Sequence, residues 1–141
     1  MINLAQNTEN DVVLNLTSNS SLFIFNNILP YFLFEFTSEA SNQVIYFVSE
    51  NIADLSARTR YDEFIITESG STYTNLTGGT INLNPGYVWL YNVYEQTTRD
   101  NLDPANTSGI VSTGRVFYTP NTTNGYISFS ATTNNIYFNQ Y

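Results

Sequence analysis

Carboxylates are the side chains of this chain that could do acid–base chemistry, because it contains no cysteine and no histidine. The commonest zinc ligand, the commonest general base and every thiolate reaction are therefore missing from the sequence. Asp62 and Glu63 are neighbours in a strand-like stretch, so their side chains point to opposite faces and cannot act as an acid–base pair. We expect both to lie on a solvated face without a catalytic role.

A second group of oxygen atoms follows Arg99. Asp100 and Asp103, with Asn101 and backbone carbonyls, could offer ligands to a calcium ion. The spacing matches no EF-hand loop and lacks its terminal glutamate, so turn hydrogen bonds and a pairing with Arg99 are the favoured interpretation. The glycines show no phosphate-binding spacing. We predict no enzymatic activity, no catalytic residue, no metal site and no cofactor.

The charge balance limits the direct partners. Four basic and twelve acidic residues give a net charge of −8, whereas nucleic-acid binding through phosphate neutralisation requires a basic surface. The most apolar run, residues 22–36, is interrupted by two asparagines and a proline and carries Glu35. It falls short of the ~20 apolar residues that a membrane helix needs. We expect neither nucleic acid nor a membrane as a partner.

Residues 82–99 form the stretch around which the other elements are expected to be arranged. Pro85-Gly86 is a turn dipeptide, because proline presets φ and glycine accepts the positive φ that follows it. From residue 87 onward the chain is rich in aromatic and β-branched residues, and both faces are largely apolar, which predicts a central strand. The face expected to line the core carries Tyr87, Trp89, Tyr91 and Val93.

Further strands are predicted at residues 12–17, 31–37, 43–49, 61–68, 80–83 and 112–119. Residues 31–37 place Phe34 and Phe36 on an apolar core face and pair antiparallel with residues 43–49. Residues 50–60 form an irregular crossover between sheets, and residues 112–119 form an edge strand beside the central one. About seven to nine antiparallel strands predict an all-β protein with an immunoglobulin-like β-sandwich.

The expected organisation is one β-sandwich domain over residues 1–120, followed by a tail. Residues 1–11 are polar and read as an arm or a lead-in strand. Residues 22–28 suit either a short strand or an insertion that packs apolar residues against a neighbouring molecule, and the insertion is favoured. Its candidate contact residues are Leu22, Phe23, Phe25 and Ile28.

The tail, residues 121–141, is biased toward Asn, Thr and aromatic residues and carries no charged side chain. A free strand-prone tail would be an aggregation hazard, so we expect it to dock on its own sheet or on a neighbouring subunit. An equally weighted alternative makes the tail and residues 22–28 ordinary apolar packing under loops. The candidate contact residues of the tail are Tyr126, Phe129, Tyr137 and Phe138.

Two resemblances go beyond these patterns. The order Leu83-x-Pro85-Gly86-x-x-x-x-Tyr91 resembles the turn into the penultimate strands of fibronectin III and immunoglobulin-like domains, where a corner tyrosine hydrogen-bonds to the backbone upstream. The chain from about residue 28 to residue 119 also resembles small β-sandwich virion proteins of tailed bacteriophages, as in crAss-like phages and their relatives in Bacteroidetes hosts. The stretches that carry this resemblance are residues 31–37, 60–68, 86–96, 101–104 and 113–116.

The phage resemblance implies an auxiliary protein that decorates the outside of the head shell, in a virion assembled in the cytoplasm of a bacterial host. Its implied partners are the major capsid protein or other virion proteins, with self-association, and it assigns no functional residue. A tail, collar or fibre component of the same virion is an alternative. A carbohydrate-binding module, with exposed aromatic rings stacked on sugars, is another, although Trp89 suits the core better than a sugar platform.

Overall fold

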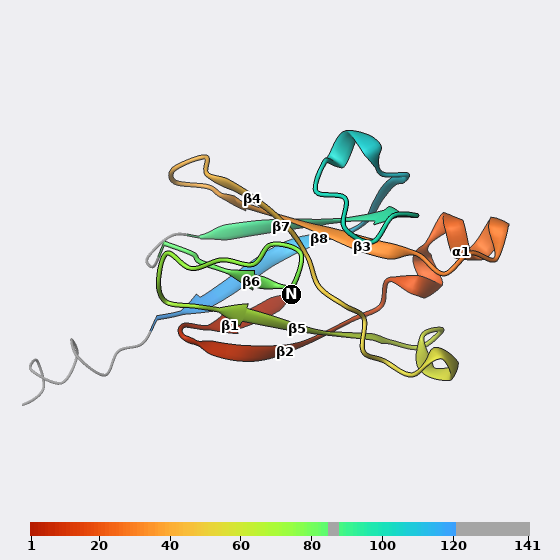
Figure 1. Ribbon diagram of the computed structural model, residues 1–141, viewed down its shortest axis with the longest axis horizontal. Coiled ribbons are helices and arrows are strands. Elements are labelled where there is room, and N and C mark those ends of the chain that lie inside the picture. The colour runs from red at the N-terminus through yellow and green to blue at the C-terminus, as the bar shows by residue number, and fades with distance from the viewer. Residues whose placement is uncertain (85–87, 121–141) are drawn as a thin grey trace, which may run out of the picture.

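The computed structural model describes residues 1–84 and 88–120 (Figure 1). Eight strands in two sheets dominate this part, which confirms the all-β class. None of the helices within it is long and apolar enough to cross a membrane. The strands are β1 (Ile2–Ala5), β2 (Thr8–Leu14), β3 (Tyr31–Ser38), β4 (Val44–Val48), β5 (Asp62–Glu68), β6 (Thr80–Ile81), β7 (Trp89–Gln96) and β8 (Gly109–Thr119). The helical segments are α1 (Ser21–Asn26) and the 3₁₀ turns η1 (Thr17–Asn19), η2 (Leu55–Ala57) and η3 (Pro104–Asn106).

The larger sheet has five strands in the order β1-β8-β7-β3-β4. β7 lies in its middle, antiparallel to β3 on one side and to β8 on the other, which confirms the predicted central strand. Trp89, Tyr91 and Val93 are buried, and the residues between them are half-exposed, because side chains alternate between the two faces of a strand. Tyr87, the fourth residue of the predicted core face, lies outside the described residues.

β3 and β4 form the antiparallel hairpin that the sequence predicted. Phe34 lies opposite Phe47 in this pairing, and both rings are completely buried. Asn42, with φ of 59°, helps the connector between the strands to reverse, since asparagine tolerates the left-handed region better than most residues. The hairpin leaves β4 as the last strand of the larger sheet.

The smaller sheet contains β2, β5 and β6 in the order β2-β5-β6. Every second residue of β5 is buried, beginning with Asp62 and ending with Glu68. The side of β5 that faces away from β2 is covered by β6 near Glu68 and by an isolated bridge from Asn51 to Phe64. Residues 50–60 form the irregular crossover that was expected, and it includes η2.

Residues 1–11 hold β1 and most of β2 and are not a free arm. β1 pairs in parallel with the end of β8, and its Ile2 side chain is buried in the core. The chain then turns at Asn7, with φ of 60°, and β2 enters the other sheet. The Asn10 side chain fixes this turn: its oxygen accepts from the Ala5 N–H at 2.8 Å, and its NH₂ group donates to the Ala5 carbonyl at 3.2 Å.

Two expectations about strand pairing are wrong. β8 is not an edge strand, because β1 pairs with residues 116–119 on the side away from β7. The strands are not all antiparallel either, since β1 with β8 and β5 with β6 are parallel pairs. Both parallel pairs involve a short strand, and the alternation of residues within a strand carries no information about such a partner.

The corner hydrogen bond suggested for Tyr91 is not found among the described residues. Its hydroxyl oxygen lies 3.5 Å from the amino nitrogen of Met1. The ring lies against Gly114 of β8, the residue directly opposite Tyr91 in the pairing. Tyr91 therefore packs against β8, with its hydroxyl beside the amino group of Met1.

An aromatic cluster fills the space between the two sheets. Phe34 stacks on Phe47 with ring centroids 5.2 Å apart, and Phe64 of the smaller sheet meets Phe34 edge-on at 5.1 Å. Each such pair contributes about 0.5–1.5 kcal/mol beyond the burial of its area. The described part of the predicted core lies in this cluster or beside it, namely Phe34, Phe36, Trp89, Tyr91 and Val93.

Candidate functional site

Three long connections gather at one end of the molecule. β2 leads to β3 through residues 15–30, β4 leads to β5 through residues 49–61, and β7 leads to β8 through residues 97–108. Figure 1 shows α1 standing out at this end, whereas β8 finishes at the opposite end. Connections held by a rigid scaffold carry function more often than the strands they join, so this end is the candidate site.

The ends of helix α1 are fixed although the helix is only six residues long. Ser20 is its N-cap, with a side-chain oxygen that accepts from the Phe23 N–H at 3.3 Å. Asn27 is its C-cap, in the left-handed conformation with φ of 56°, and its N–H donates to the carbonyls of Leu22 and Phe23. None of the helical residues is fully buried, so the caps define the helix more than its packing does.

A carboxylate of the central strand holds the start of α1. Glu95, 4% exposed, accepts hydrogen bonds from the Ser20 hydroxyl, from the Ser21 N–H at 3.3 Å and from the Leu22 N–H at 3.2 Å. Burial by itself raises the pKa of Glu95, but the hydrogen bonds from Ser20, Ser21 and Leu22 favour the ionised form. The net result is a lowered pKa, so Glu95 is a charged anchor for the helix.

Asp62 joins the same end to the smaller sheet. Its fully buried carboxylate accepts from the N–H groups of Leu16 and Thr17, each at 2.8 Å, and from the Asn51 side-chain amide at 2.6 Å. The prediction that Asp62 lies on a solvated face is therefore wrong, because the connection after β2 folds over the start of β5 and supplies hydrogen-bond donors. Glu63 is half-exposed. The structure gives Asp62 a clear role in holding two connections together.

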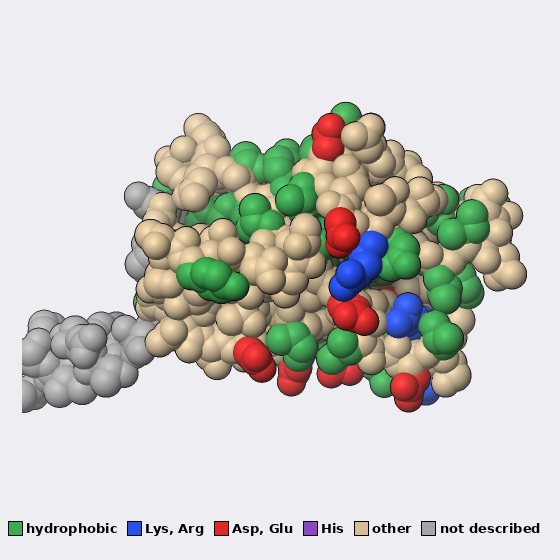
Figure 2. Space-filling model, in the orientation of Figure 1, with side chains coloured by type: hydrophobic (Ala, Val, Ile, Leu, Met, Phe, Trp, Pro, Cys, Tyr) green, Lys and Arg blue, Asp and Glu red, His purple; other side chains and the backbone are tan. Residues whose placement is uncertain are grey.

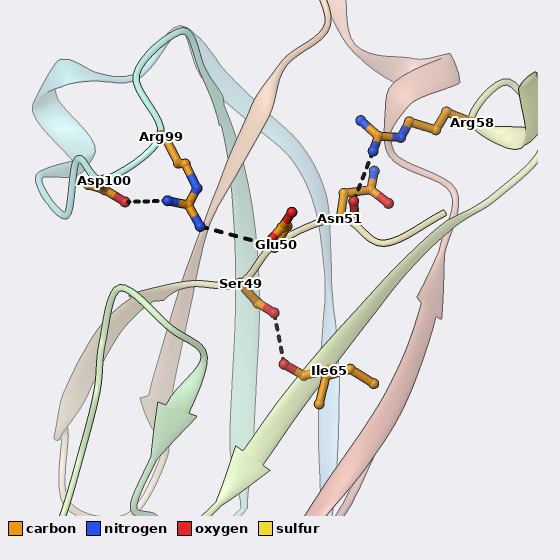
Figure 3. Close-up of polar contacts among 7 residues, drawn as sticks. All are labelled: Ser49, Glu50, Asn51, Arg58, Ile65, Arg99 and Asp100. Carbon is orange, nitrogen blue, oxygen red and sulfur yellow. Dashed lines mark hydrogen bonds and ion pairs between the residues drawn. The ribbon is translucent and has the colours of Figure 1, made fainter. Parts of the chain in front are cut away.

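A cavity of about 270 Å³ lies between the start of β3 and the connection after β4. Arg58 and Arg99 contribute to its polar wall (Figure 3). The Arg58 guanidinium donates to the carbonyls of Ala53 at 3.0 Å and Asn51 at 2.8 Å. Arg99 lies 3.7 Å from the Glu50 carboxylate on the exposed rim. Both cations therefore have a partner within the part of the chain that the structure describes.

The loop after Arg99 is organised by its own hydrogen bonds. Asp103 caps η3, because its carboxylate accepts from the Ala105 N–H at 2.9 Å. Asp100 lies 3.9 Å from Arg99, on the exposed surface. Asn101 donates to the Gln96 side chain at 2.8 Å. In residues 1–84 and 88–120, no three His, Cys, Asp or Glu side chains are grouped as a metal site requires.

Large apolar side chains lie exposed on and beside α1. Phe25 is 81% exposed and Ile24 is 55% exposed. Figure 2 shows apolar side chains at the end of the molecule where α1 stands out. Four of these exposed side chains fall within residues 24–29 and the fifth is Tyr31, and apolar groups exposed close together are typical of interaction surfaces. We call this group the end patch, and its members are Ile24, Phe25, Ile28, Leu29 and Tyr31.

The predicted contact residues of the insertion divide into two pairs. Phe25 and Ile28 lie in the end patch, whereas Leu22 and Phe23 are half-buried. The short-strand alternative for residues 22–28 is wrong, because the caps fold this segment into a helix. The predicted contacts in the tail lie outside the described residues, namely Tyr126, Phe129, Tyr137 and Phe138.

Three members of the end patch were not predicted, namely Ile24, Leu29 and Tyr31. Ile24 lies on α1, whereas Leu29 follows the helix and Tyr31 begins β3. Their exposure depends on where the helix ends, and the apolar composition of the segment carried no signal for that. No protein-family model, curated protein or solved structure matches the chain, so its function must be inferred from its own geometry.

Proposed function

We propose that this chain is a non-enzymatic structural protein of a tailed-phage virion, which decorates the outside of the head shell and contacts it through the end patch. The single observation that carries this function is the exposure of Phe25, 81%, on a helix whose two ends are both capped. A large ring held in water at a fixed place is suited to insertion into a pocket of another protein. The resemblance of residues 28–119 to phage virion proteins supplies the class of that partner.

The charge distribution agrees with such a contact. The net charge of −8 keeps separate copies soluble and apart, while no member of the end patch carries a charge. Burying the end patch therefore requires no desolvation of a charged side chain in the patch itself. A shell protein with an apolar pocket would bury the end patch on binding. The negative charge on the rest of the chain would still make separate copies repel one another, which favours attachment to the shell over aggregation.

We also propose that the two sheets form an immunoglobulin-like sandwich. The order β8-β7-β3-β4 follows the G-F-C-C′ order of variable-type domains, and β2 against β5 corresponds to B against E. β6 departs from that pattern, because it follows β5 in the chain and pairs with it in parallel. In this assignment the three gathered connections lie at the end that carries the binding loops in variable domains.

Purified phage particles test the function directly. Quantitative mass spectrometry should find hundreds of copies of the chain per virion, a number that a tail or collar ring cannot hold. Absence from the particles would overturn the proposal. Binding to a glycan array in that case would favour the carbohydrate-binding alternative, for which Trp89 cannot serve as the stacking platform because it is completely buried.

A matched pair of variants tests the end patch. Phe25→Ser removes the most exposed ring of the patch, and Phe117→Ser removes a ring that is 52% exposed on β8, away from it. Burying one such side chain contributes about 1.5–3 kcal/mol, so Phe25→Ser should weaken binding to particles stripped of the chain roughly 10- to 100-fold. Phe117→Ser should bind as the unaltered chain does. Equal loss in both variants would exclude the end patch as the contact.

A further inference from the structure

β4 has a free side. It is the last strand of the larger sheet, and its neighbour β3 covers only one of its two sides. The Ser38 N–H donates to the Gln43 carbonyl at 2.9 Å, so Gln43 faces β3, whereas the Val48 N–H points the other way and donates to the Leu76 carbonyl at 2.7 Å. Since these directions alternate along a strand, the backbone groups of Val44 and Tyr46 also point away from β3.

On this side of β4 only Val48, at the end of the strand, is paired, with Leu76 of the loop before β6. The backbone groups of Val44 and Tyr46 that face outward have no hydrogen-bond partner among residues 1–84 and 88–120. The strand reads Val-Ile-Tyr-Phe-Val, without the proline, lysine or other charged residue by which proteins commonly block pairing with another chain. An edge of this kind is a template for an added strand.

A groove of about 540 Å³ runs beside the same strand. Its walls mix apolar and hydroxyl side chains from β4, from the loop before β6 and from the loop after β7. An added strand would place alternate side chains on the two sides of the sheet, and this groove could take large ones. The residues that form the walls include Val44, Ile45, Tyr46, Thr74, Leu76 and Leu102.

We propose that the free side of β4 receives, as an added strand, the C-terminal segment of a second copy of this chain. The sequence continues for 21 residues after Pro120, and this stretch, residues 121–141, has no charged side chain. All twelve acidic residues precede this stretch. It is therefore the part of the chain that can approach the β4 edge of another copy, with its net charge of −8, against the least electrostatic repulsion. Tyr126-Ile-Ser-Phe129 and Ile136-Tyr-Phe138 supply strand-forming residues.

The strand directions favour a second copy over the chain's own segment. β8, β7, β3 and β4 alternate in direction, so β8 finishes at the end where β4 begins. The chain's own segment could enter beside β4 only as a parallel strand, after crossing a sheet width of about 19 Å. A segment from another copy can enter antiparallel, which is the commoner and slightly more stable pairing. Reciprocal exchange would then close a two-fold dimer in which both edges are paired.

Disulfide trapping tests the contact, because the natural chain has no cysteine. Val44→Cys and Ser128→Cys are made as separate full-length chains, mixed and oxidised gently. A disulfide-linked heterodimer should form roughly tenfold more than in a mixture of Val13→Cys with Ser128→Cys, since Val13 is exposed but lies in the other sheet. Equal yields in the two mixtures would overturn the proposal. A second outcome would also overturn it: a double variant that carries both cysteines in one chain and forms only intramolecular disulfides.

A proline on the free side gives an independent measurement. Tyr46→Pro removes an N–H that points away from β3, so no backbone bond between β3 and β4 is lost. The hydrogen bond of the Tyr46 hydroxyl with Glu35 is lost equally in the control Tyr46→Phe. The unaltered chain and the control Tyr46→Phe should shift from monomer to dimer with increasing concentration in sedimentation velocity, while Tyr46→Pro should stay monomeric. A monomeric unaltered chain at every concentration would overturn the proposal, as would a Tyr46→Pro chain that dimerises normally. This proposal does not depend on the virion function, because neither experiment uses a phage particle.

Discussion

Glu95 of β7 and Ser20 before α1 are joined by a buried hydrogen bond across 75 residues of sequence. The Ser20 hydroxyl donates to the Glu95 carboxylate, and the same oxygen accepts from the Phe23 N–H. The N-cap of a surface helix is thus held by a strand at the centre of the larger sheet. The core therefore sets the position of the end patch.

Replacing Glu95 by glutamine should lower the free energy of unfolding at neutral pH. It should also reduce the loss of stability that the unaltered chain shows as the pH falls. The folded-state pKa of Glu95 lies below its ordinary value of 4.5, so the ionised group stabilises the fold above the unfolded-state pKa, and this contribution is lost as the pH falls through the lower, folded-state pKa. Glu95→Gln should cost about 1–3 kcal/mol at pH 7, because buried donors lose their charged acceptor. Urea unfolding at a series of pH values, followed by fluorescence of the single tryptophan, measures both effects.

Glu9→Gln is the control for that experiment, since Glu9 is exposed on β2. It should keep the acid dependence of the unaltered chain. If Glu95→Gln also keeps that dependence, the carboxylate does not anchor α1 as described.

Asp62→Asn should destabilise the fold by about 2–4 kcal/mol. The amide presents an NH₂ group where a carboxylate oxygen now accepts from Thr17 or Asn51, so at least one buried donor is left without an acceptor. The midpoint of chemical unfolding measures the loss. Glu63→Gln, one residue further on the half-exposed face, should change stability by no more than about 0.5 kcal/mol. Similar losses in the two variants would contradict the network described for Asp62.

Gly114→Ala should destabilise the larger sheet by about 1–3 kcal/mol. A Cβ atom on Gly114 would lie 2.7 Å from the Cε1 atom of Tyr91, so the ring or the strand has to move. Thr113→Ala, at an exposed neighbouring position, controls for the change to alanine in β8. Tyr91→Val removes the ring, and in a double-mutant cycle it should make Gly114→Ala much less costly. Additive losses in that cycle would show that the two residues do not collide.

Phe25→Ser should leave the stability of the isolated protein within about 0.5 kcal/mol, whereas Phe47→Ala should cost about 3–5 kcal/mol. The contrast follows from exposure, because Phe25 is 81% exposed and Phe47 is completely buried between Phe34 and Phe36. Thermal unfolding of both variants measures it. A large loss in Phe25→Ser would mean that the ring supports the fold and is not free for a partner.

The sequence was most informative where one strand has a regular pattern. The alternation in β3, β5 and β7 is read directly from every second residue, and the short connector at residues 39–43 pairs β3 with β4. A partner far away in the sequence leaves no such local mark. For that reason the parallel pairing of β1 with β8 and the contact of Glu95 with α1 could not be predicted.

Helix α1 shows how local preference was overridden. Its residues Leu22–Phe25 favour a strand by their type, yet the caps at Ser20 and Asn27 and the Glu95 carboxylate stabilise a helix of six residues. The predicted contact function of this segment followed from its apolar composition alone. Which of its side chains face solvent depended on the helix, which leaves Phe25 and Ile28 exposed and Leu22 and Phe23 half-buried.

The parallel pair of β1 and β8 also decides when, during synthesis, the larger sheet can be completed. The partners of Ile2–Ala5, residues Val116–Thr119, are made more than a hundred residues later, roughly ten seconds at ordinary rates of translation. Until then the apolar side chains of Ile2 and Leu4 have no place in the core. The nascent chain therefore exposes these two apolar side chains until β8 is made, and chaperones that bind short apolar segments have access to them during this time.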